Sequence, residues 1–534
     1  MAEDFTNQQA AGVNYQGEAV VIKAGAGTGK TSVLRGYAKA NPHLRMLYLC
    51  YNKAIQVEAS SKFPKNVICR TGHAIAFARA GKSIEHKLTG NLRLTDIKNF
   101  INTPNWEIVK EANNIFEKFL SSASLEIGNE HAKHLPEFTE RQRHRKQVVV
   151  AAAQQMWMAA TDPNNTFPAT HDVYLKLYCL REPELHTWFQ VILFDEAQDA
   201  NPVISDLIYR QQCRHVIVGD DHQQLYRFRG ADNSMDAFAK AKKADVLYLT
   251  KSFRFGHNIA LVASHLLKYK TQVTGCDPFP IEGFEKISDQ VYQYLPSQML
   301  NEPHTRLHRT VSGTLKTALK FINKKIFWVG GIDAYNLQEV LDVFYLSMDE
   351  KDKIKRRRLL AEFRDYETYK DAAKSSKDIE MNRIVKIIDE HGPSLTRKIS
   401  VLRKNAVTDE VNADLTISTA HRSKGLEWDT VVLEEDFPDL LSPDISEKKD
   451  TDEIADELNL MYVASTRAMK TLQPNEIVLA ILKLVNANKP LDFVNYPGRA
   501  AVTQDKPVVD NGPRRIATTS DNEPQKIRIS DPRD

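Results

Sequence analysis

Short apolar runs, rich in β-branched residues and leucine, recur in the first 80 residues and again after residue 184. Runs of this kind predict buried strands of a parallel sheet. They cover residues 20–24, 45–50, 66–70, 190–194, 215–218 and 430–433. Residues 32–40 follow the first run with the amphipathic pattern of a helix. This alternation of strands and helices predicts an α/β protein with parallel sheets.

Two stretches replace the alternation with helical periodicity. Residues 81–184 predict a helical insertion with helices at 95–100, 106–120 and 139–160. Residues 306–321 and 325–331 predict a helix and a strand, and residues 337–406 predict a smaller, highly charged accessory insertion. Residues 491–534 are too polar to bury a core, which predicts a flexible tail. We therefore expect one α/β domain from residues 1–80 and 185–250, and a second from residues 251–336 and 407–490.

Composition narrows the class of protein. The chain has 534 residues, of which 42% are hydrophobic and 26% charged, as in a soluble globular protein. No run approaches the ~18 consecutive apolar residues that cross a bilayer, and the polar start is unlike a secretory signal. We therefore expect a cytoplasmic protein without a membrane partner. The five scattered cysteines form no C-x-x-C pair, which argues against a zinc or iron–sulfur site. A net charge of +3 does not by itself predict nucleic-acid binding.

A glycine-rich loop joins the first predicted strand to its helix. Its sequence is Ala24-Gly25-Ala26-Gly27-Thr28-Gly29-Lys30-Thr31. Glycines allow backbone N–H groups to converge on phosphate oxygens, while a lysine such as Lys30 reaches the β- and γ-phosphates and a threonine such as Thr31 coordinates Mg²⁺. Ala24 stands where the strict pattern has glycine, and an ordinary β-to-α connection is the alternative interpretation. The loop predicts a nucleotide site but does not distinguish kinases, GTPases, ATPases and motors.

Polar residues follow several of the other predicted strands. Asp195 and Glu196 end the strand at 190–194, where a phosphoryl-transfer site needs one carboxylate for Mg²⁺ and one to orient and deprotonate water. Gln223, which could sense a γ-phosphate, precedes Phe228 and Arg229, which could stack on a base or neutralise phosphates. This adjacency predicts coupling between two ligands.

These segments together resemble the motifs of the superfamily 1 DNA helicases of the UvrD/Rep/PcrA group. Motifs I, Ia, Ib, II, III, IV, V and VI of that group resemble, in order, residues 24–31, 51–53, 71–73, 194–199, 219–231, 249–254, 418–428 and 457–468. The wording of motifs Ia and Ib is nearer to the helicase core of F-box DNA helicases, although we expect no F-box-like segment here. The motifs run in order from Gln9 to Arg467, so their joint occurrence by chance is negligible.

The resemblance implies two RecA-like P-loop domains with parallel sheets, each with a helical insertion, and a site for ATP and Mg²⁺ between them. Implied catalytic residues are Lys30, Asp195, Glu196, Gln223, Arg254 and Arg467, the last as an arginine finger. Implied nucleotide ligands are Gln9, the loop from Ala24 to Thr31, Phe253 (stacking on adenine), Arg254, Glu427 and Arg467, with Thr31 and Asp195 on the metal. Implied DNA contacts are Tyr51, Asn52, His73, Phe228, Arg229 and His421. Phe228 stands where that group usually has tryptophan, and phenylalanine can still stack.

The resemblance also implies an ATP-dependent single-stranded DNA translocase or helicase with 3′ to 5′ movement. Its substrates would be single-stranded DNA and DNA junctions, in repair or recombination, and it would be nucleoid-associated if bacterial. The alternative is an ATP-gated DNA sensor or assembly factor that controls a protein partner through the accessory insertion or the tail. The accessory insertion has only about 70 residues, so its role in duplex contact is open.

Overall fold

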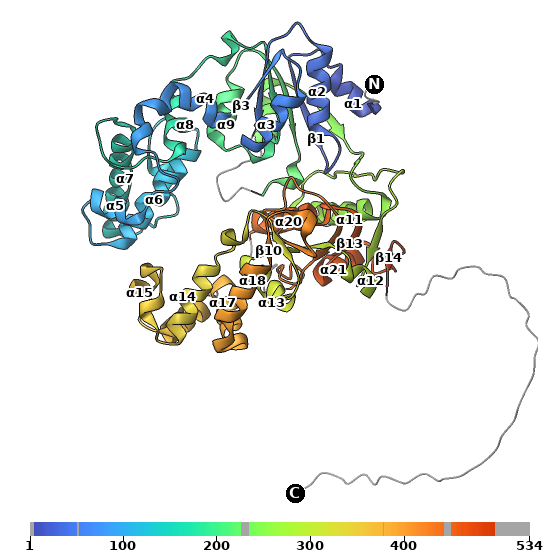
Figure 1. Cartoon of the computed structure of the whole chain (residues 1–534). Coiled ribbons are helices and arrows are strands. Elements are labelled where there is room, and N and C mark those ends of the chain that lie inside the picture. The colour runs from blue at the N-terminus through green and yellow to red at the C-terminus, as the bar shows by residue number, and fades with distance from the viewer. Residues whose placement is uncertain (1–4, 51–52, 226–233, 377–378, 443–449, 497–534) are drawn as a thin grey trace, which may run out of the picture. The chain divides into compact units, whose positions relative to one another are not determined.

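Two parallel sheets organise the protein (Figure 1). The computed structural model describes residues 5–50, 53–225, 234–376, 379–442 and 450–496. The first sheet has six strands in the order β3-β2-β4-β5-β1-β6, and the second has eight in the order β10-β9-β11-β8-β12-β13-β7-β14. Every strand pairing in both sheets is parallel. The predicted α/β fold with two parallel sheets is therefore confirmed.

The glycine-rich loop follows β1, the fifth of the six strands in the first sheet. Its strands are β1 (Ala19–Ala24), β2 (Met46–Cys50), β3 (Val67–Thr71), β4 (Val191–Phe194), β5 (Arg214–Gly219) and β6 (Asp245–Leu249). Its helices are α1 (Asn7–Val13), α2 (Lys30–Ala40), α3 (Lys53–Lys62), α4 (Gly72–Ala76), α9 (Pro202–Tyr209) and α10 (Ser234–Lys242). The chain leaves β1 and returns in β2, three positions away in the sheet, and the strands between them are β5 and β4. The carboxyl ends of β1, β5 and β4 therefore lie side by side. Open α/β sheets bind ligands at such a point.

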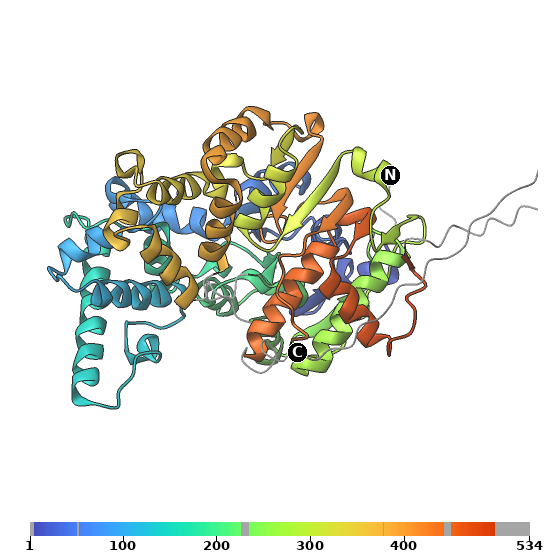
Figure 2. The ribbon, with the colours of Figure 1, turned by 90° about the horizontal axis from the view of Figure 1, so that it is seen from below.

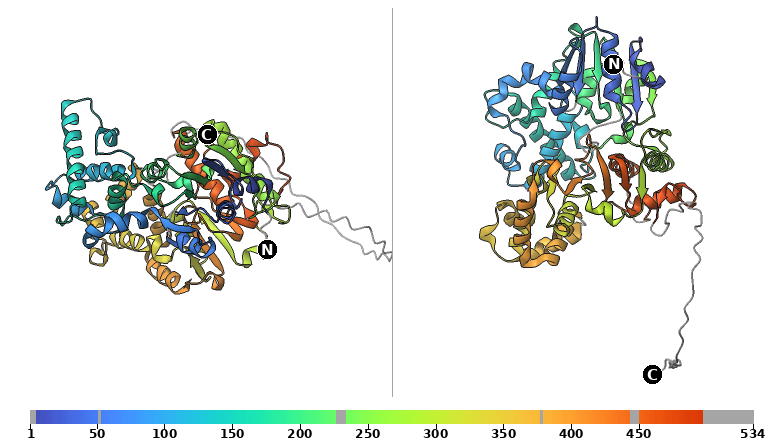
Figure 3. Two further views of the ribbon diagram at one scale, coloured as in Figure 1. Left: turned by 90° about the horizontal axis from the view of Figure 1, so that it is seen from above. Right: turned by 45° about the vertical axis from the view of Figure 1, so that its right-hand side comes forward.

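The first insertion is helical, as predicted. Its main helices are α5 (Leu94–Phe100), α6 (Trp106–Ser121), α7 (Glu140–Thr161) and α8 (His171–Leu180). Its apolar side chains share one buried cluster with those of the first sheet, so the insertion is packed against the sheet domain. Figure 3 shows the long helix α7, in teal, at one edge of the insertion.

The second sheet draws its strands from the remainder of the chain. They are β7 (Gln290–Tyr292), β8 (His304–His308), β9 (Ile326–Trp328), β10 (Ala406–Val407), β11 (Leu415–Thr419), β12 (Trp428–Leu433), β13 (Ala468–Gln473) and β14 (Val494–Asn495). The helices near it are α11 (His257–Thr274), α12 (Ser297–Asn301), α13 (Val311–Lys320), α20 (Thr451–Ser465) and α21 (Glu476–Val485). Helices α11 and α20 pack side by side, green and orange-red in Figure 2.

The accessory insertion contains five α-helices among its described residues. They are α14 (Leu337–Ser347), α15 (Arg357–Glu362), α16 (Tyr366–Ser376), α17 (Ile379–His391) and α18 (Leu395–Asn405). The predicted end of this insertion at 406 is one residue late, because Ala406 already pairs with Ile326 in the second sheet. None of the helices in the described part of the chain combines the length and the apolar character that crossing a membrane requires.

Two predicted boundaries need correction. The helix predicted over residues 306–321 begins only after the N-cap Thr310, because residues 304–308 form the buried strand β8. The predicted tail over 491–534 starts too early, because Leu491 is buried and β14 pairs with β7. In both places polar neighbours hide a short buried segment from the hydrophobic pattern. The rest of that predicted tail, residues 497–534, lies outside the described residues.

Candidate functional site

The glycine-rich loop runs from the end of β1 to the start of α2 with two glycines at positive φ. Gly27 has φ +72° and Gly29 has φ +83°, a region that favours glycine. The Thr28 hydroxyl donates to the Gly25 carbonyl at 2.9 Å and tightens the turn. A Cβ on Gly27 would lie 2.6 Å from Ser252 Oγ. Only glycine therefore lets the loop lie this close to the segment that follows β6. The loop thus has the backbone conformation that a phosphate-binding loop requires.

Gln9 supports this loop from helix α1. Thr6 and Gln9 form a capping box, in which Gln9 Oε1 accepts from the Thr6 amide at 3.1 Å. The side-chain nitrogen Nε2 of Gln9 donates to the backbone carbonyl of Thr28 at 3.0 Å. Its side chain is 5% exposed, so Gln9 is not an ordinary surface residue. Both ends of its amide are used within the protein, and one of them holds the loop.

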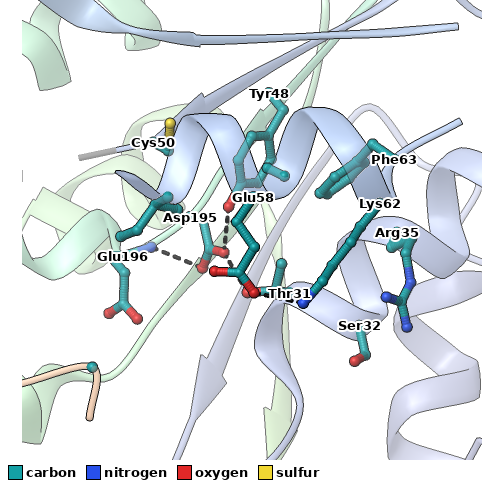
Figure 4. Close-up of a pocket in the computed structure, with 13 residues that line it drawn as sticks. Thr31, Ser32, Arg35, Tyr48, Cys50, Glu58, Lys62, Phe63, Asp195 and Glu196 are labelled. Atoms are coloured by element: carbon teal, nitrogen blue, oxygen red, sulfur yellow. Dashed lines mark hydrogen bonds and ion pairs between the residues drawn. The ribbon is translucent and has the colours of Figure 1, made fainter. Parts of the chain in front are cut away.

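The Thr31 hydroxyl and the Asp195 carboxylate meet where β4 ends beside α2 (Figure 4). Thr31 Oγ1 donates to Asp195 Oδ2 at 2.7 Å, and Tyr48 OH donates to the same oxygen at 2.9 Å. Burial, together with the charge of Glu196, raises the pKa of Asp195. A hydroxyl and a carboxylate suit Mg²⁺, which takes few protein ligands and completes its shell with water and phosphate oxygens. No three His, Cys, Asp or Glu side chains of the described residues form a metal-binding group, so the donor set here fits Mg²⁺ rather than zinc.

Glu196 lies next to this pair in a strained backbone conformation, with φ +52°. Its Oε1 atom lies 3.7 Å from Lys30 Nζ, and its Oε2 accepts from Gln198 Nε2 at 2.6 Å. Burial raises the pKa of Glu196, but the charges of Lys30 and Lys424 outweigh burial and bring the pKa to about 2. Glu196 is therefore ionised at neutral pH and able to accept a hydrogen bond from water.

Arg467 reaches this site from the second sheet. It lies between α20 and β13 and is 1% exposed. Its Nη2 donates to Gln223 Oε1 at 3.3 Å, and Gln223 Nε2 donates to Asp220 Oδ2 at 2.7 Å. Burial and the neighbouring Arg254 lower the pKa of Arg467 to about 9, so it stays charged at neutral pH. The buried Arg467 guanidinium beside the second sheet thus contacts Gln223, which follows the first sheet.

Arg254 and two other predicted nucleotide ligands surround a cavity beside the loop. Arg254 Nε donates to Glu427 Oε2 at 2.7 Å, and its Nη1 donates to the Thr466 carbonyl at 3.2 Å. The cavity has a volume of about 280 Å³ and is lined by Gly27, Phe253, Arg254, Ile287, Glu427, Met469 and Lys470. The structure therefore brings Phe253, Arg254 and Glu427 together beside Gly27.

Two residues of the site have no role in the sequence prediction. Tyr462 of α20 accepts from the Ala26 amide at 3.0 Å and donates to Asp220 Oδ2 at 3.5 Å. Lys424 forms an ion pair with Asp199 and donates to the Gln223 carbonyl at 2.6 Å. Both residues lie in segments that resemble helicase motifs, Lys424 in 418–428 and Tyr462 in 457–468, but the resemblance gave neither of them a role.

The predicted DNA contacts are less completely described. Tyr51, Asn52, Phe228 and Arg229 lie outside the described residues. His73 Nε2 lies 3.0 Å from Asp172 Oδ1 of the first insertion. Burial and the charge of Arg309 lower the pKa of His421 to about 4, so this imidazole is neutral at physiological pH. The DNA-binding roles of these residues stay predictions.

Comparison with known proteins finds DNA helicases among the relatives of this chain. The sequence model of the UvrD-like helicase C-terminal domain matches residues 89–473. F-box DNA helicase 1 of Gallus gallus is 32% identical over 531 residues, covering 90% of this chain and 50% of that protein. F-box DNA helicase protein 1 of Schizosaccharomyces pombe is 30% identical over 510 residues, covering 88% of this chain and 56% of that protein. A probable DNA helicase II homolog of Mycoplasma genitalium is 22% identical over 430 residues, covering 61% of this chain and 60% of that protein.

The chain spans about half the length of the two F-box relatives. The family match, in contrast, covers most of the chain, including the residues from both sheets that surround the glycine-rich loop. The chain belongs to the UvrD-like helicase family.

Proposed function

We propose that this chain is an ATP-dependent translocase of single-stranded DNA that unwinds duplexes or removes bound proteins. The observation that supports this most strongly is the hydrogen bond from Arg467 to Gln223, which joins the second sheet to the first beside the glycine-rich loop. An ATPase site shared between two halves changes as they separate and close, which is what a motor needs. The names of the relatives, which are DNA helicases, support DNA as the track.

Each polar group of the site has a task in this proposal. Thr31 and Asp195 would hold Mg²⁺, and bound ATP would supply the phosphoryl group. Lys30 neutralises charge on the phosphates, and Glu196 orients a water and accepts its proton. Arg254 and Arg467 stabilise the charge that develops on the transferred group, because guanidinium offers a fixed fork of donors and stays charged.

Movement requires coupling between the nucleotide and the DNA strand. Gln223, which contacts Arg467, precedes Phe228 by five positions in the chain, and the family resemblance gives Phe228 the role of stacking on a base, so we propose that this segment couples the nucleotide to the DNA. Base stacking on aromatics contributes about 1–3 kcal/mol per base and is tolerant of sequence, which suits a translocase. We propose 3′ to 5′ movement from the family resemblance.

A strand-separation assay tests the proposal. The substrates are duplexes with a 3′ or a 5′ single-stranded tail, and the variants are Lys30→Ala and the matched control Lys39→Ala at an exposed position of α2. We expect the unaltered chain and Lys39→Ala to separate 3′-tailed substrates with ATP, and Lys30→Ala to fail. DNA-stimulated ATPase without separation or protein displacement would instead favour the ATP-gated sensor.

A further inference from the structure

A second cavity begins at the catalytic carboxylates and shares no lining residue with the cavity beside Phe253. It has a volume of about 260 Å³ and lies between helices α2 and α3 (Figure 4). Helix α2 contributes Thr31, Ser32 and Arg35 to its lining, and helix α3 contributes Glu58, Ala59 and Lys62. The candidate active site therefore borders two separate cavities.

The charges of this second cavity are unevenly distributed. Asp195 and Glu196 lie at one end and Arg35 lies toward the other, while the Lys62 side chain extends between them and pairs with Glu58 (Figure 4). Helical spacing explains the positions of the two cations: Arg35 follows Thr31 by one turn of α2, and Lys62 follows Glu58 by one turn of α3. An anion released beside the carboxylates is repelled at that end and attracted toward the two cations.

The two cations also lie nearer to solvent than Asp195 does. Asp195 is 4% exposed, whereas the side chains of Glu58 and Lys62 are 61% and 53% exposed and form an ion pair at 2.5 Å. An exposed pair of this kind contributes little stability and exchanges partners readily. Lys62 can therefore leave Glu58 for an anion at small cost.

We propose that this cavity is the exit route for inorganic phosphate, with Arg35 and Lys62 as a transient phosphate site. The inference rests on the proposed ATPase activity. We place the nucleotide in the cavity beside Phe253, so phosphate needs another way out while ADP remains bound there. The hydroxyls of Thr31 and Ser32 add hydrogen-bond donors along the route. The expected order is hydrolysis, phosphate release through the second cavity, and then ADP release.

The experiment separates chemistry from release in the full chain with single-stranded DNA. Rapid quenching measures ATP cleavage in a single turnover, and a fluorescent phosphate-binding sensor measures free phosphate in a parallel sample. Arg35→Gln/Lys62→Gln removes both cations, Ala59→Leu narrows the cavity from α3, and Lys65→Gln at an exposed position outside the cavity is the matched control.

We expect cleavage and phosphate release to be nearly concurrent in the unaltered chain and in Lys65→Gln. In the double variant and in Ala59→Leu, the rate of phosphate release should be about tenfold lower than the rate of cleavage. The double variant lacks the two cations that attract phosphate, and Ala59→Leu narrows the cavity. Release that stays concurrent with cleavage in both variants would overturn the exit route while leaving the proposed function intact. Absence of cleavage in the unaltered chain would overturn the proposed function and this inference with it.

Discussion

Lys270 Nζ lies 3.1 Å from His222 Nδ1 in a buried contact between helix α11 and the loop that follows β5. The same ammonium donates to Asn459 Oδ1 at 2.8 Å, and Asn459 Nδ2 donates to the Gln224 carbonyl at 3.1 Å. Since lysine can only donate, the imidazole accepts at Nδ1 and carries its proton on Nε2. Two residues from the second half thus hold the loop that contains Gln223.

Lys270→Met should therefore destabilise the protein and weaken ATP hydrolysis. It leaves buried acceptors on His222 and Asn459 unsatisfied, which costs about 1–3 kcal/mol each. We expect a lower free energy of unfolding in a denaturant titration and a lower DNA-stimulated turnover. Lys268→Met, at an exposed position of the same helix, should change neither quantity. Equal stability of the two variants would contradict this account.

Arg467→Ala should lower ATP turnover by a factor on the order of 10³ or more, the usual effect of removing an arginine finger. Arg467→Lys should recover little of it, because a lysine cannot reproduce the planar fork that reaches Gln223, Leu426 and Val463. Steady-state kinetics measure the effect, and thermal unfolding of the same samples shows whether the fold survives. A turnover near that of the unaltered chain would remove Arg467 from the catalytic group.

Tyr48→Phe should weaken Mg²⁺ binding with little effect on the fold. The substitution keeps the ring but removes the hydroxyl that donates to Asp195 Oδ2 at 2.9 Å. Partners that orient a metal ligand typically alter metal affinity at least about tenfold. A Mg²⁺ titration of ATPase activity at saturating ATP should show this shift in the half-maximal concentration, and an unchanged titration curve would show that Tyr48 serves packing alone.

Asp199 should set the acid limb of the ATPase pH profile. Burial raises the pKa of Asp199 to about 6, against the opposing charge of Lys424. Below about pH 6 the carboxyl takes up a proton and its ion pair with Lys424 weakens. Activity should fall there, and Asp199→Asn should have reduced activity without this inflection. An acid limb that survives in Asp199→Asn would point to another group.

The raised pKa of Asp199 has the opposite effect on the stability of the fold. The pKa of Asp199 is higher in the folded chain than its ordinary value of 3.8, so between about pH 4 and pH 6 the folded state holds a proton that the unfolded state has lost. The contribution of Asp199 to the free energy of unfolding therefore decreases as pH rises through this window. Acid denaturation of Asp199→Asn measures it.

The hydrophobic pattern predicted the buried strands whose residues are mostly apolar, but it did not predict the equally buried β11, in which Thr416, Ser418 and Thr419 interrupt the apolar run. Residues 20–22 are fully buried and form β1, as expected from their apolar side chains. It did not predict β6, where Asp245, Val246 and Tyr248 are exposed. It also did not predict β8, in which His304 and Arg306 form hydrogen bonds with polar partners. Burial of a polar side chain depends on its partner, which the periodicity of one segment does not reveal.

The candidate site was predictable where each chemical group belongs to a local motif. Lys30, Thr31, Asp195 and Glu196 follow strands in patterns that carry their own chemistry. The partners of Ala26 and Asp199 were not predictable, because Tyr462 and Lys424 lie 436 and 225 positions away from them. Contacts of that separation depend on how the two sheets pack.

The hydrogen bond between the Ala26 amide and the Tyr462 hydroxyl has a mechanical consequence. Ala26 lies in the loop after β1 of the first sheet and Tyr462 lies on α20 beside the second sheet, so the two halves cannot separate without breaking this bond. A single bond of this type contributes about 0.5–1.5 kcal/mol, which thermal motion overcomes quickly. In the proposed motor this bond would break and re-form as the two halves separate and close, and its breakage would report the moment at which they part.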